Sequence, residues 1–339
     1  MKAVILAGGL GTRLRPVTGE HPKPMVPLLG RPVMEHIVEL LRKNGYTQIC
    51  AALHYRAGEI MAHFGDGRKF GVSMEYRIET ENLGTAGSVK NCRDFYKDED
   101  FLVISADAAC DYDLELLMQA HRVRGGAATL ALSAEKTPLR YGLAVTDSEG
   151  RIRSFIEKPD WPQVVTDLVN TGIYVLSPET MAYIPEGPFD FGRDLFPKLL
   201  REGVPLCGQV MAGYWRDIGT PQDYYRCCAD ALDGKLRLTP GPAFQLAEPA
   251  VPQDRAEEGY VLSCDCEDRA RLMGTLSELT LDMGARFDDG IRLEGKDFAM
   301  HISPSAVRSA VRIAVCAEDA EYARALCVSA RDVAEKLRM

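Results

Sequence analysis

Residues 8–27 read GGLGTRLRPVTGEHPKPMVP and follow the short apolar run AVIL at positions 3–6. The apolar run predicts a buried strand. Gly8, Gly9 and Gly11 allow the backbone after it to turn sharply and to approach a ligand closely. Successive N–H groups in such a turn can converge on an anion. The strand and the glycine-rich loop therefore predict an anion-binding site.

Two cationic residues lie in the same stretch. Arg13 has a planar guanidinium that matches phosphate oxygens, and Lys23 lies between Pro22 and Pro24, which stiffen the chain from which its side chain starts. The loop is not a Walker loop, because no Gly-Lys-Ser/Thr follows at the required spacing. It also lacks the third glycine of a dinucleotide fingerprint. Glycines, arginine and lysine together predict a polyphosphate site.

The composition of the 339 residues, 46% hydrophobic and 26% charged, is typical of a soluble globular protein with one large and one smaller domain. A net charge of −9 argues against a general nucleic-acid surface. No apolar run is long enough to span a membrane, and the first strand leaves no room for a signal peptide. We therefore expect a cytoplasmic protein without nucleic-acid or membrane partners, and we leave open whether it forms a homo-oligomer.

The ten cysteines favour small buried thiols in a reducing compartment. Six of them lie singly, mostly among apolar residues: Cys50, Cys92, Cys110, Cys207, Cys316 and Cys327. The close-set pairs Cys227-Cys228 and Cys264-x-Cys266 lack zinc-site spacing and have no histidine nearby. We expect neither a structural metal nor a disulfide framework.

Strands and helices alternate through residues 1–235. Apolar runs at 48–53, 101–106 and 127–132 predict strands. Between the glycine loop and the strand at 48–53, a helix with Pro32 at its first position should end at Asn44-Gly45. Such alternation predicts an α/β fold, a Rossmann-like mostly parallel sheet with helices on both faces. Ligands of such sheets bind beyond the carboxyl ends of the strands, where the glycine loop would lie.

The remaining chain changes character twice. Residues 236–257 are rich in proline and predict a linker. Residues 258–339 predict a small α+β domain with a helix near 267–279, strands at 291–293, 298–302 and 311–315, and a last helix whose apolar stripe is Leu326, Ala330, Val333 and Leu337. The expected domains are thus 1–235 and 258–339.

The string Gly-Gly-x-Gly-Thr-Arg-Leu-x-Pro, followed by Pro-Lys-Pro, resembles the motif of the sugar-1-phosphate nucleotidylyltransferases, also called sugar-nucleotide pyrophosphorylases. Further matching segments follow in the family's order through residue 225. The segment ETENLGTAG at 79–87 resembles the family's Leu-Gly-Thr-Ala, which borders the base and leads into a helix expected to start at about Gly87. The nucleotide-binding residues that the resemblance implies are Leu6, Gly8, Gly9, Gly11, Thr12, Glu79, Gly84 and Thr85.

The resemblance also implies a magnesium ion held by two aspartates. Asp107 occupies the place of the aspartate in the family's Gly-Asp pair, with Ala106 replacing the glycine, and Asp217 resembles the second metal ligand. Mg²⁺ favours one or two carboxylates together with substrate phosphates. Asp111 and Asp113, just downstream of Asp107, are better explained as helix caps.

The sugar phosphate is expected on segments that resemble the family's Tyr-Gly, Glu-Lys-Pro and Asn-x-Gly-Ile-Tyr. The residues that these segments assign are Tyr141, Gly142, Glu157, Lys158, Asn170 and Thr171. The resemblance assigns catalysis to Arg13, Lys23, Asp107, Lys158 and Asp217.

Residues 258–339 resemble the C-terminal domain of the phosphohexomutases. The loop at 303–309 reads SPSAVRS and lacks the arginine, glycine and threonine that clamp phosphate in that family. The mutase phosphoserine and metal loops are also missing from the chain, so we reject mutase activity. A packing or dimerising domain is favoured, and Arg308 leaves an anion-sensing role open.

The resemblance implies an enzyme that joins a sugar 1-phosphate to a nucleoside triphosphate and releases pyrophosphate. Mannose 1-phosphate with GTP is favoured, because the two activities of phosphomannomutase and guanylyltransferase occur fused. Glucose 1-phosphate with UTP or dTTP is the alternative substrate pair. A non-catalytic sugar-nucleotide-binding regulatory protein and a structural partner of a polysaccharide-synthesis assembly are alternatives from other functional classes.

Overall fold

The computed structural model describes residues 1–241, 256–263, 266–280, 283–286, 290–304, 310–317 and 319–338. The chain forms two compact units, each built from two stretches of sequence. The first unit is Met1–Leu10 with Val33–Trp215, and the second is Gly11–Pro32 with Arg216–Met339. The predicted domain boundaries at 235 and 258 stay predictions, and most of the predicted linker, residues 242–255, lies outside the described residues.

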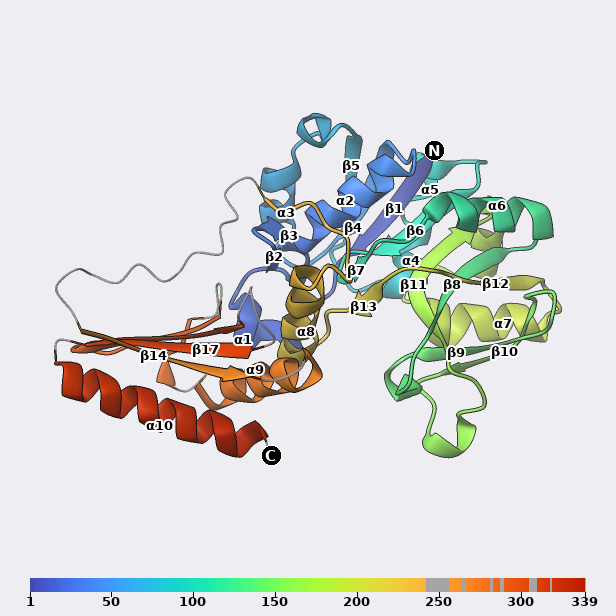
Figure 1. Ribbon diagram of the computed structural model, residues 1–339. Coiled ribbons are helices and arrows are strands. Elements are labelled where there is room, and N and C mark those ends of the chain that lie inside the picture. Colours follow the sequence, from blue (N-terminus) through green and yellow to red (C-terminus); the bar gives the residue numbers. More distant parts are fainter. Residues whose placement is uncertain are drawn as a thin grey trace. The chain divides into compact units, whose positions relative to one another are not determined.

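The first unit is built on a nine-stranded sheet (Figure 1). Its strands are β1 (Lys2–Ala7), β4 (Gln48–Leu53), β5 (Ser73–Ile78), β6 (Phe101–Ser105), β8 (Ala128–Ala134), β9 (Gly142–Thr146), β10 (Ile152–Glu157), β11 (Leu168–Leu176) and β12 (Leu206–Val210). Strands β5, β4, β1 and β6 are parallel neighbours, as are β8 and β12. Strand β11 is antiparallel to β6, β8 and β9, and β9 is antiparallel to β10. The predicted α/β class and Rossmann-like sheet are confirmed.

The helices of this unit pack around the sheet. They are α2 (Val33–Lys43), α3 (Ala57–Phe64), α4 (Gly84–Lys90), α5 (Arg93–Tyr96), α6 (Leu114–Arg124) and α7 (Phe196–Arg201), with a π-helix, η7 (Phe191–Leu195). The short 3-10 turns are η3 (Arg68–Phe70), η4 (Pro138–Arg140), η5 (Trp161–Gln163) and η6 (Pro178–Tyr183), and a short strand, β7 (Ala108–Cys110), follows β6.

Two predicted helix starts are wrong. The helix predicted to begin at Pro32 is α2, which begins at Val33. Pro32 is the last residue of the short strand β3 (Arg31–Pro32), which pairs with β2 (Pro27–Leu28). Helix α4 begins at Gly84, about a turn before the expected start, because the N–H groups of its first turn have an acceptor in a distant segment described below.

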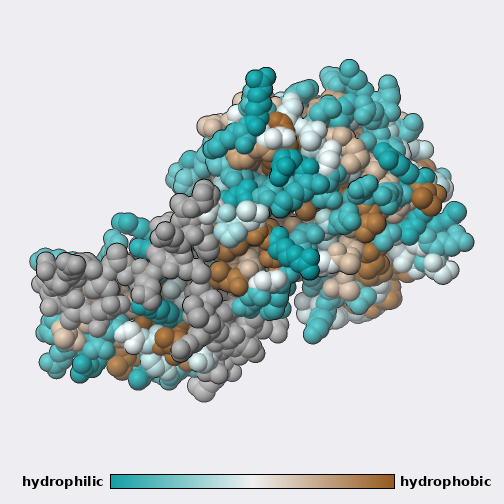
Figure 2. All heavy atoms as spheres, turned by 45° about the horizontal axis from the view of Figure 1, so that its top comes forward, coloured by the Kyte–Doolittle hydropathy of each residue, from teal (hydrophilic) through white to brown (hydrophobic). Residues whose placement is uncertain are grey.

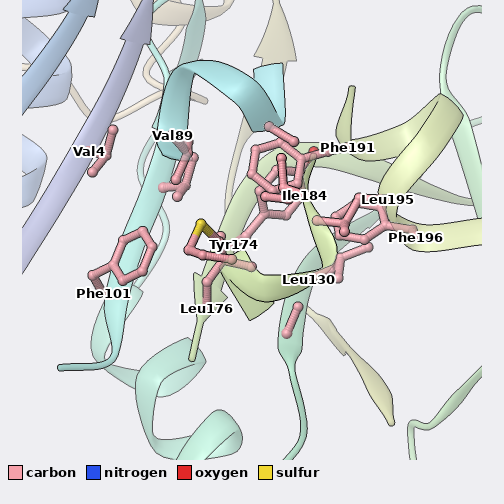
Figure 3. Packing of buried hydrophobic residues seen from close by; sticks show 14 of the residues in the cluster. Val4, Val89, Phe101, Leu130, Tyr174, Leu176, Ile184, Phe191, Leu195 and Phe196 are labelled. Carbon is pink, nitrogen blue, oxygen red and sulfur yellow. The ribbon is translucent and has the colours of Figure 1, made fainter. Parts of the chain in front are cut away.

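One hydrophobic core cluster of the first unit lies between the sheet and the helices α4, α5 and α7 (Figure 3). The ring of Phe196 has its centroid 5.2 Å from that of Tyr174, 5.3 Å from that of Phe155 and 5.6 Å from that of Phe191. Cys50 and Cys92 are completely buried in the same cluster. All the cysteines predicted to be buried are buried, and the eight cysteines within the described residues are free thiols.

The second unit holds a four-stranded antiparallel sheet in the order β14-β17-β16-β15. Its strands are β14 (Ala256–Ser263), β15 (Ile291–Glu294), β16 (Phe298–Pro304) and β17 (Ala310–Ala317), and its helices are α1 (Arg15–Thr18), α8 (Pro221–Leu232), α9 (Cys266–Thr280) and α10 (Ala320–Arg338). Helix α10 runs along strands β14 and β17 (Figure 1). The predicted small α+β domain is confirmed.

The predicted apolar stripe of the last helix is wrong at Val333, whose side chain is 44% exposed. The residues that α10 buries are the small side chains Ala323, Cys327 and Ala334. Small residues allow a helix to lie close to a sheet, so side-chain size alone misidentified the buried face.

One face of the surface is mainly hydrophilic, with apolar side chains scattered across it (Figure 2). Scattered apolar residues of this kind are normal for a folded protein surface. Within the described residues, no helix combines the length and the hydropathy that crossing a bilayer requires.

We predict that Phe196→Ala destabilises the first unit by about 3–5 kcal/mol, because the cavity would lie among three other aromatic rings. Hydrogen exchange of the slowest amides of β6 and β11 measures this loss. Val123→Ala, at an 86% exposed position of α6, is the control and should change the same amides by less than about 0.5 kcal/mol. A free energy of unfolding for Phe196→Ala within about 1 kcal/mol of the wild-type value would contradict a tightly packed core.

Candidate functional site

Gly8 lies directly after β1, where the sequence predicted close approach of the backbone. A Cβ atom at Gly8 would lie 3.3 Å from the Cβ of His54 and 3.9 Å from Oε2 of Glu79. His54 follows β4 and Glu79 follows β5, so the ends of three parallel strands meet here. The absence of a side chain at Gly8 therefore allows the backbone to lie close to His54. A Cβ at Gly9, in contrast, would meet nothing within 4 Å.

Glu79 is a buried carboxyl group, only 7% exposed. Burial raises its pKa, and the neighbouring Ser88 hydroxyl and Leu83 backbone act in the opposite direction. Its Oε1 atom has no hydrogen-bond partner within the part of the chain that the structure describes. Its carbonyl oxygen accepts a hydrogen bond from Nδ1 of His54, at 2.8 Å. A buried carboxylate with one oxygen unsatisfied is suited to bind a ligand that donates hydrogen bonds.

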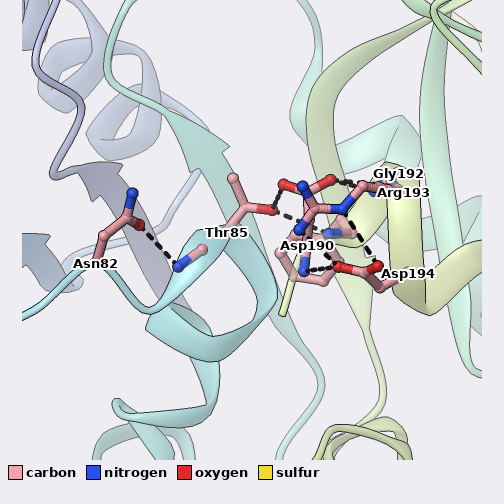
Figure 4. A network of polar contacts seen from close by, with 8 residues as sticks. Asn82, Thr85, Asp190, Gly192, Arg193 and Asp194 are labelled. Carbon is pink, nitrogen blue, oxygen red and sulfur yellow. Dashed lines mark hydrogen bonds and ion pairs between the residues drawn. The ribbon is translucent and has the colours of Figure 1, made fainter. Parts of the chain in front are cut away.

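The helix start at Gly84 is held by the chain before η7. Gly84 has φ +68°, and a Cβ there would lie 2.6 Å from the carbonyl oxygen of Phe189. The Thr85 hydroxyl donates to Oδ2 of Asp190 at 2.7 Å and accepts from the N–H of Phe191 at 2.9 Å (Figure 4). The predicted nucleotide residues Gly84 and Thr85 are thus tied to a segment that the sequence analysis missed.

Glu157 ends β10 and pairs with Gly142 of β9. A Cβ at Gly142 would lie 2.8 Å from Oε2 of Glu157, and a Cβ at Gly192 would lie 2.3 Å from the same oxygen. The carboxylate therefore occupies a space that exists only because both neighbours are glycines. Burial raises the pKa of Glu157, as does the nearby charge of Asp190, while Lys158 acts in the opposite direction.

Lys158 has φ +47°, in the left-handed region that non-glycine residues rarely adopt. Its N–H donates to the carbonyl oxygen of Tyr141 at 3.0 Å. The ring of Tyr141 lies 5.3 Å from that of Trp215 in an edge-on contact. Leu29, Arg56 and Lys97 also have a positive φ, so the role of Lys158 rests on its motif and stays a prediction.

Asn170 and Thr171 of β11 are hydrogen-bonded within the sheet. Nδ2 of Asn170 donates to the hydroxyl of Tyr174 at 2.9 Å, and the buried Thr171 hydroxyl donates to the carbonyl oxygen of Ala131 at 2.8 Å. Their roles toward a sugar stay predictions.

Asp107 follows β6 at the same sheet edge as Gly8 and Glu79. Its Oδ1 accepts a hydrogen bond from the Ser105 hydroxyl. The intervening Ala106 is buried and donates its N–H to the carbonyl oxygen of Leu6 at 2.9 Å, so alanine in place of the family's glycine keeps β6 paired with β1.

The two aspartates downstream of Asp107 differ in role. Asp113 caps α6, as predicted, by accepting from the N–H groups of Glu115 and Leu116. Asp111 instead accepts from the N–H of Tyr214 at 2.7 Å, so the prediction that it is a helix cap is wrong.

The second unit holds Arg13 and Lys23, the two cationic residues of the glycine-rich stretch. Gly11, with φ +59°, precedes the 3-10 turn η1 (Thr12–Leu14) that carries Arg13, and a Cβ at Gly11 would lie 2.9 Å from the Cβ of Lys23. Nζ of Lys23, in the turn η2 (Lys23–Met25), lies 3.3 Å from Oδ1 of Asp217, the last residue of β13 (Trp215–Asp217). The fold thus joins two predicted catalytic residues that are 194 positions apart in sequence.

The donor chemistry of the predicted metal ligands fits magnesium. Asp107 and Asp217 offer carboxylate oxygens, the hard donors that Mg²⁺ prefers. Among the residues that the structure describes, no group of three or more His, Cys, Asp or Glu side chains gathers into a metal site.

Comparisons with known proteins identify relatives of the chain. Residues 2–234 match the family model described as nucleotidyl transferase. The chain is 39% identical to the UTP–glucose-1-phosphate uridylyltransferase of Synechocystis over 73% of this chain and 67% of that protein. It is 36% identical to the mannose-1-phosphate guanylyltransferase of Mycobacterium tuberculosis over 72% of this chain and 67% of that protein.

A solved structure of HddC from Yersinia pseudotuberculosis, complexed with GMP-PN, is 31% identical to the chain and aligns with a TM-score of 0.59 over 68% of this chain and 99% of that one. The strand-end glycines, the ordered motifs and these relatives lead to one conclusion: the chain belongs to the nucleotidyl transferase family, among sugar-1-phosphate nucleotidyltransferases.

Proposed function

We propose that this protein transfers a nucleotidyl group from a nucleoside triphosphate to a sugar 1-phosphate and releases pyrophosphate. The observation that carries the proposal is the ion pair between Lys23 and Asp217, within a chain whose residues 2–234 match the family. Both residues belong to segments that resemble motifs of the family. Mannose 1-phosphate with GTP is the favoured substrate pair, and glucose 1-phosphate with UTP or dTTP is the alternative.

In this proposal an oxygen of the sugar phosphate attacks the α-phosphorus in line, and catalysis rests on positioning and on electrostatic stabilisation. Arg13 and Lys23 offset charge on the triphosphate and on the leaving pyrophosphate. Lys158 orients the attacking phosphate, and Glu157 accepts hydrogen bonds from the sugar. Asp107 and Asp217 would hold Mg²⁺, which would neutralise phosphate charge when bound.

The unsatisfied oxygen of Glu79 supports guanine as the base. Guanine presents two adjacent donors, N1–H and the exocyclic amino group. A carboxylate can accept one hydrogen bond with each oxygen, or accept both with a single oxygen that bridges the two donors. Uracil and thymine present one N–H between two carbonyl oxygens. The negative charge of a carboxylate repels these oxygens. A donating ligand also favours the charged form of a carboxyl group whose pKa is raised by burial.

We place the reaction in the cytoplasm, in line with the free thiols of the described cysteines. A regulatory protein that binds sugar nucleotides without turnover is the second candidate. It is distinguished by assaying pyrophosphate release for GTP, UTP, dTTP and ATP, each combined with mannose 1-phosphate and glucose 1-phosphate. Binding without release in every combination would favour the regulatory protein, and neither binding nor release would favour a structural role.

We predict that Arg13→Ala leaves folding unchanged and lowers kcat by a factor equivalent to about 2–4 kcal/mol, the usual loss for one preorganised electrostatic group. Steady-state pyrophosphate release measures kcat, and circular dichroism checks folding. Arg68→Ala, at a side chain 89% exposed, is the matched control. A turnover number near that of the wild type would remove Arg13 from the mechanism.

Replacing Glu79 tests the base. The wild type should favour GTP over inosine triphosphate, which lacks the exocyclic amino group, by about 10–100-fold in kcat/KM, the value of one hydrogen bond to a charged group. Glu79→Gln should lower kcat/KM for GTP by a similar factor. It should also reduce the ratio of kcat/KM for GTP to kcat/KM for UTP. The neighbouring exposed Glu81→Gln is the control. Equal use of GTP and UTP by the wild type would contradict the assignment of guanine.

Glu157 should cost stability at neutral pH. Its pKa is higher in the folded protein than the ordinary 4.5, so the folded state binds the proton more tightly and stability falls as pH rises from 4.5 through the raised pKa. We predict that Glu157→Gln has a higher melting temperature than the wild type at pH 7. The two melting temperatures should become equal near pH 4. Thermal melting from pH 4 to 8 tests this, and a difference independent of pH would contradict it.

A further inference from the structure

The segment of residues 189–192 contacts both the predicted nucleotide segment and the predicted sugar carboxylate. Its first residue, Phe189, accepts at its carbonyl oxygen from the N–H groups of Ala86 and Gly87, at 2.9 and 3.0 Å, and donates its own N–H to the carbonyl oxygen of Leu83 at 2.9 Å. The bond from Ala86 satisfies an N–H of the first turn of α4, which has no acceptor in its own helix.

The side chain of Asp190 continues the link (Figure 4). One carboxylate oxygen accepts from the Thr85 hydroxyl at 2.7 Å, and the other accepts from the N–H groups of Gly192 and Arg193, both at 3.0 Å. The N–H of Asp190 donates to Oδ2 of Asp194 at 2.8 Å. One carboxylate thus caps η7 and holds Thr85 at the same time.

The far end of the segment meets Glu157. Gly192 leaves the space that Oε2 of Glu157 occupies, since a Cβ there would lie 2.3 Å from that oxygen. The preceding Phe191 is buried and its ring lies 4.9 Å from that of Tyr174, which anchors the segment to the core. The position of Gly192, set by the cap at Asp190, therefore limits where the carboxylate of Glu157 can lie.

Stability alone does not explain this arrangement. Thr85 is exposed, so its hydroxyl could bond to water instead, and the net gain from its bond to Asp190 is small. The carboxylate of Asp190 also adds a like charge near Glu157 and raises the pKa of that group. Local features that cost stability are expected at functional sites.

We propose that Asp190 is a positioning residue, which holds Thr85 and Glu157 in a fixed relation so that nucleotide and sugar phosphate are aligned for attack. This inference rests on the proposed function. Small misalignment of reacting groups lowers the rate of the chemical step more than it weakens binding.

A set of four variants tests the link through Asp190. Thr85→Val keeps the shape of the side chain and removes the hydroxyl, and we expect kcat to fall about 10–100-fold while KM for each substrate changes less than about 3-fold. Thr85→Ser restores the hydroxyl and should return kcat to within about 3-fold of the wild type. Asp190→Ala combined with Thr85→Val should be no slower than Asp190→Ala alone, because both changes break the same link.

The Glu157 end is tested by Gly192→Ala. The added methyl group should push the carboxylate away and raise KM for the sugar 1-phosphate by about 10-fold, with KM for the triphosphate unchanged within about 3-fold. Gly58→Ala is the matched control, because Gly58 lies in helix α3 and a Cβ there meets nothing within 4 Å.

Three results would overturn the inference, and they are distinguishable. Wild-type constants in both Thr85→Val and Gly192→Ala would show that the segment does not align the substrates. Loss of kcat in both Thr85→Val and Thr85→Ser, with a matching fall in melting temperature, would assign a purely structural role. A wild type without turnover for any substrate pair would contradict the proposed function, and the positioning role with it.

Discussion

The parallel arrangement of β5, β4, β1 and β6 is the constraint on which the site of the first unit depends. Parallel strands end at the same edge, so residues that directly follow them are brought together whatever their separation in sequence. Gly8, His54, Glu79 and Asp107 each come within two residues of the end of one of these strands. The contact of Gly8 with His54 and its approach to Glu79 are direct consequences of this geometry.

Most of the sheet could be predicted because its causes are local, whereas the roles of the candidate site residues stay predictions. Apolar runs defined the strands, and the carboxyl groups that follow them were selected from short motifs. The start of α4 could not be predicted in the same way, since its first N–H groups bind a carbonyl oxygen about 100 residues away, at Phe189. The role of Asp190 was missed for the same reason. A signal existed, because aspartate is one of the residues preferred at the N-cap of a helix.

Two candidate ligand-binding carboxyl groups of this unit, the buried Glu79 and the half-buried Glu157, cost stability. Glu79 and Glu157 both have pKa values raised by burial, so each destabilises the fold once it is ionised. A core selected for stability alone would have replaced them with neutral side chains of similar size. Glu157 lies instead against Gly142 and Gly192, whose bare backbone leaves the room for its carboxylate.

These glycines also limit how independently the base and the sugar can be selected. The helix that borders the predicted base pocket begins at Gly84, which has no room for a side chain beside Phe189, and Glu157 has no room to spare beside Gly192. Phe189 and Gly192 belong to one short segment, held by the Asp190 carboxylate. A change that moves this segment to suit a different sugar must also move the start of α4. Under the proposed function, selectivity for one substrate would therefore be coupled to the placement of the other through this segment of backbone, in addition to any direct contact between the two.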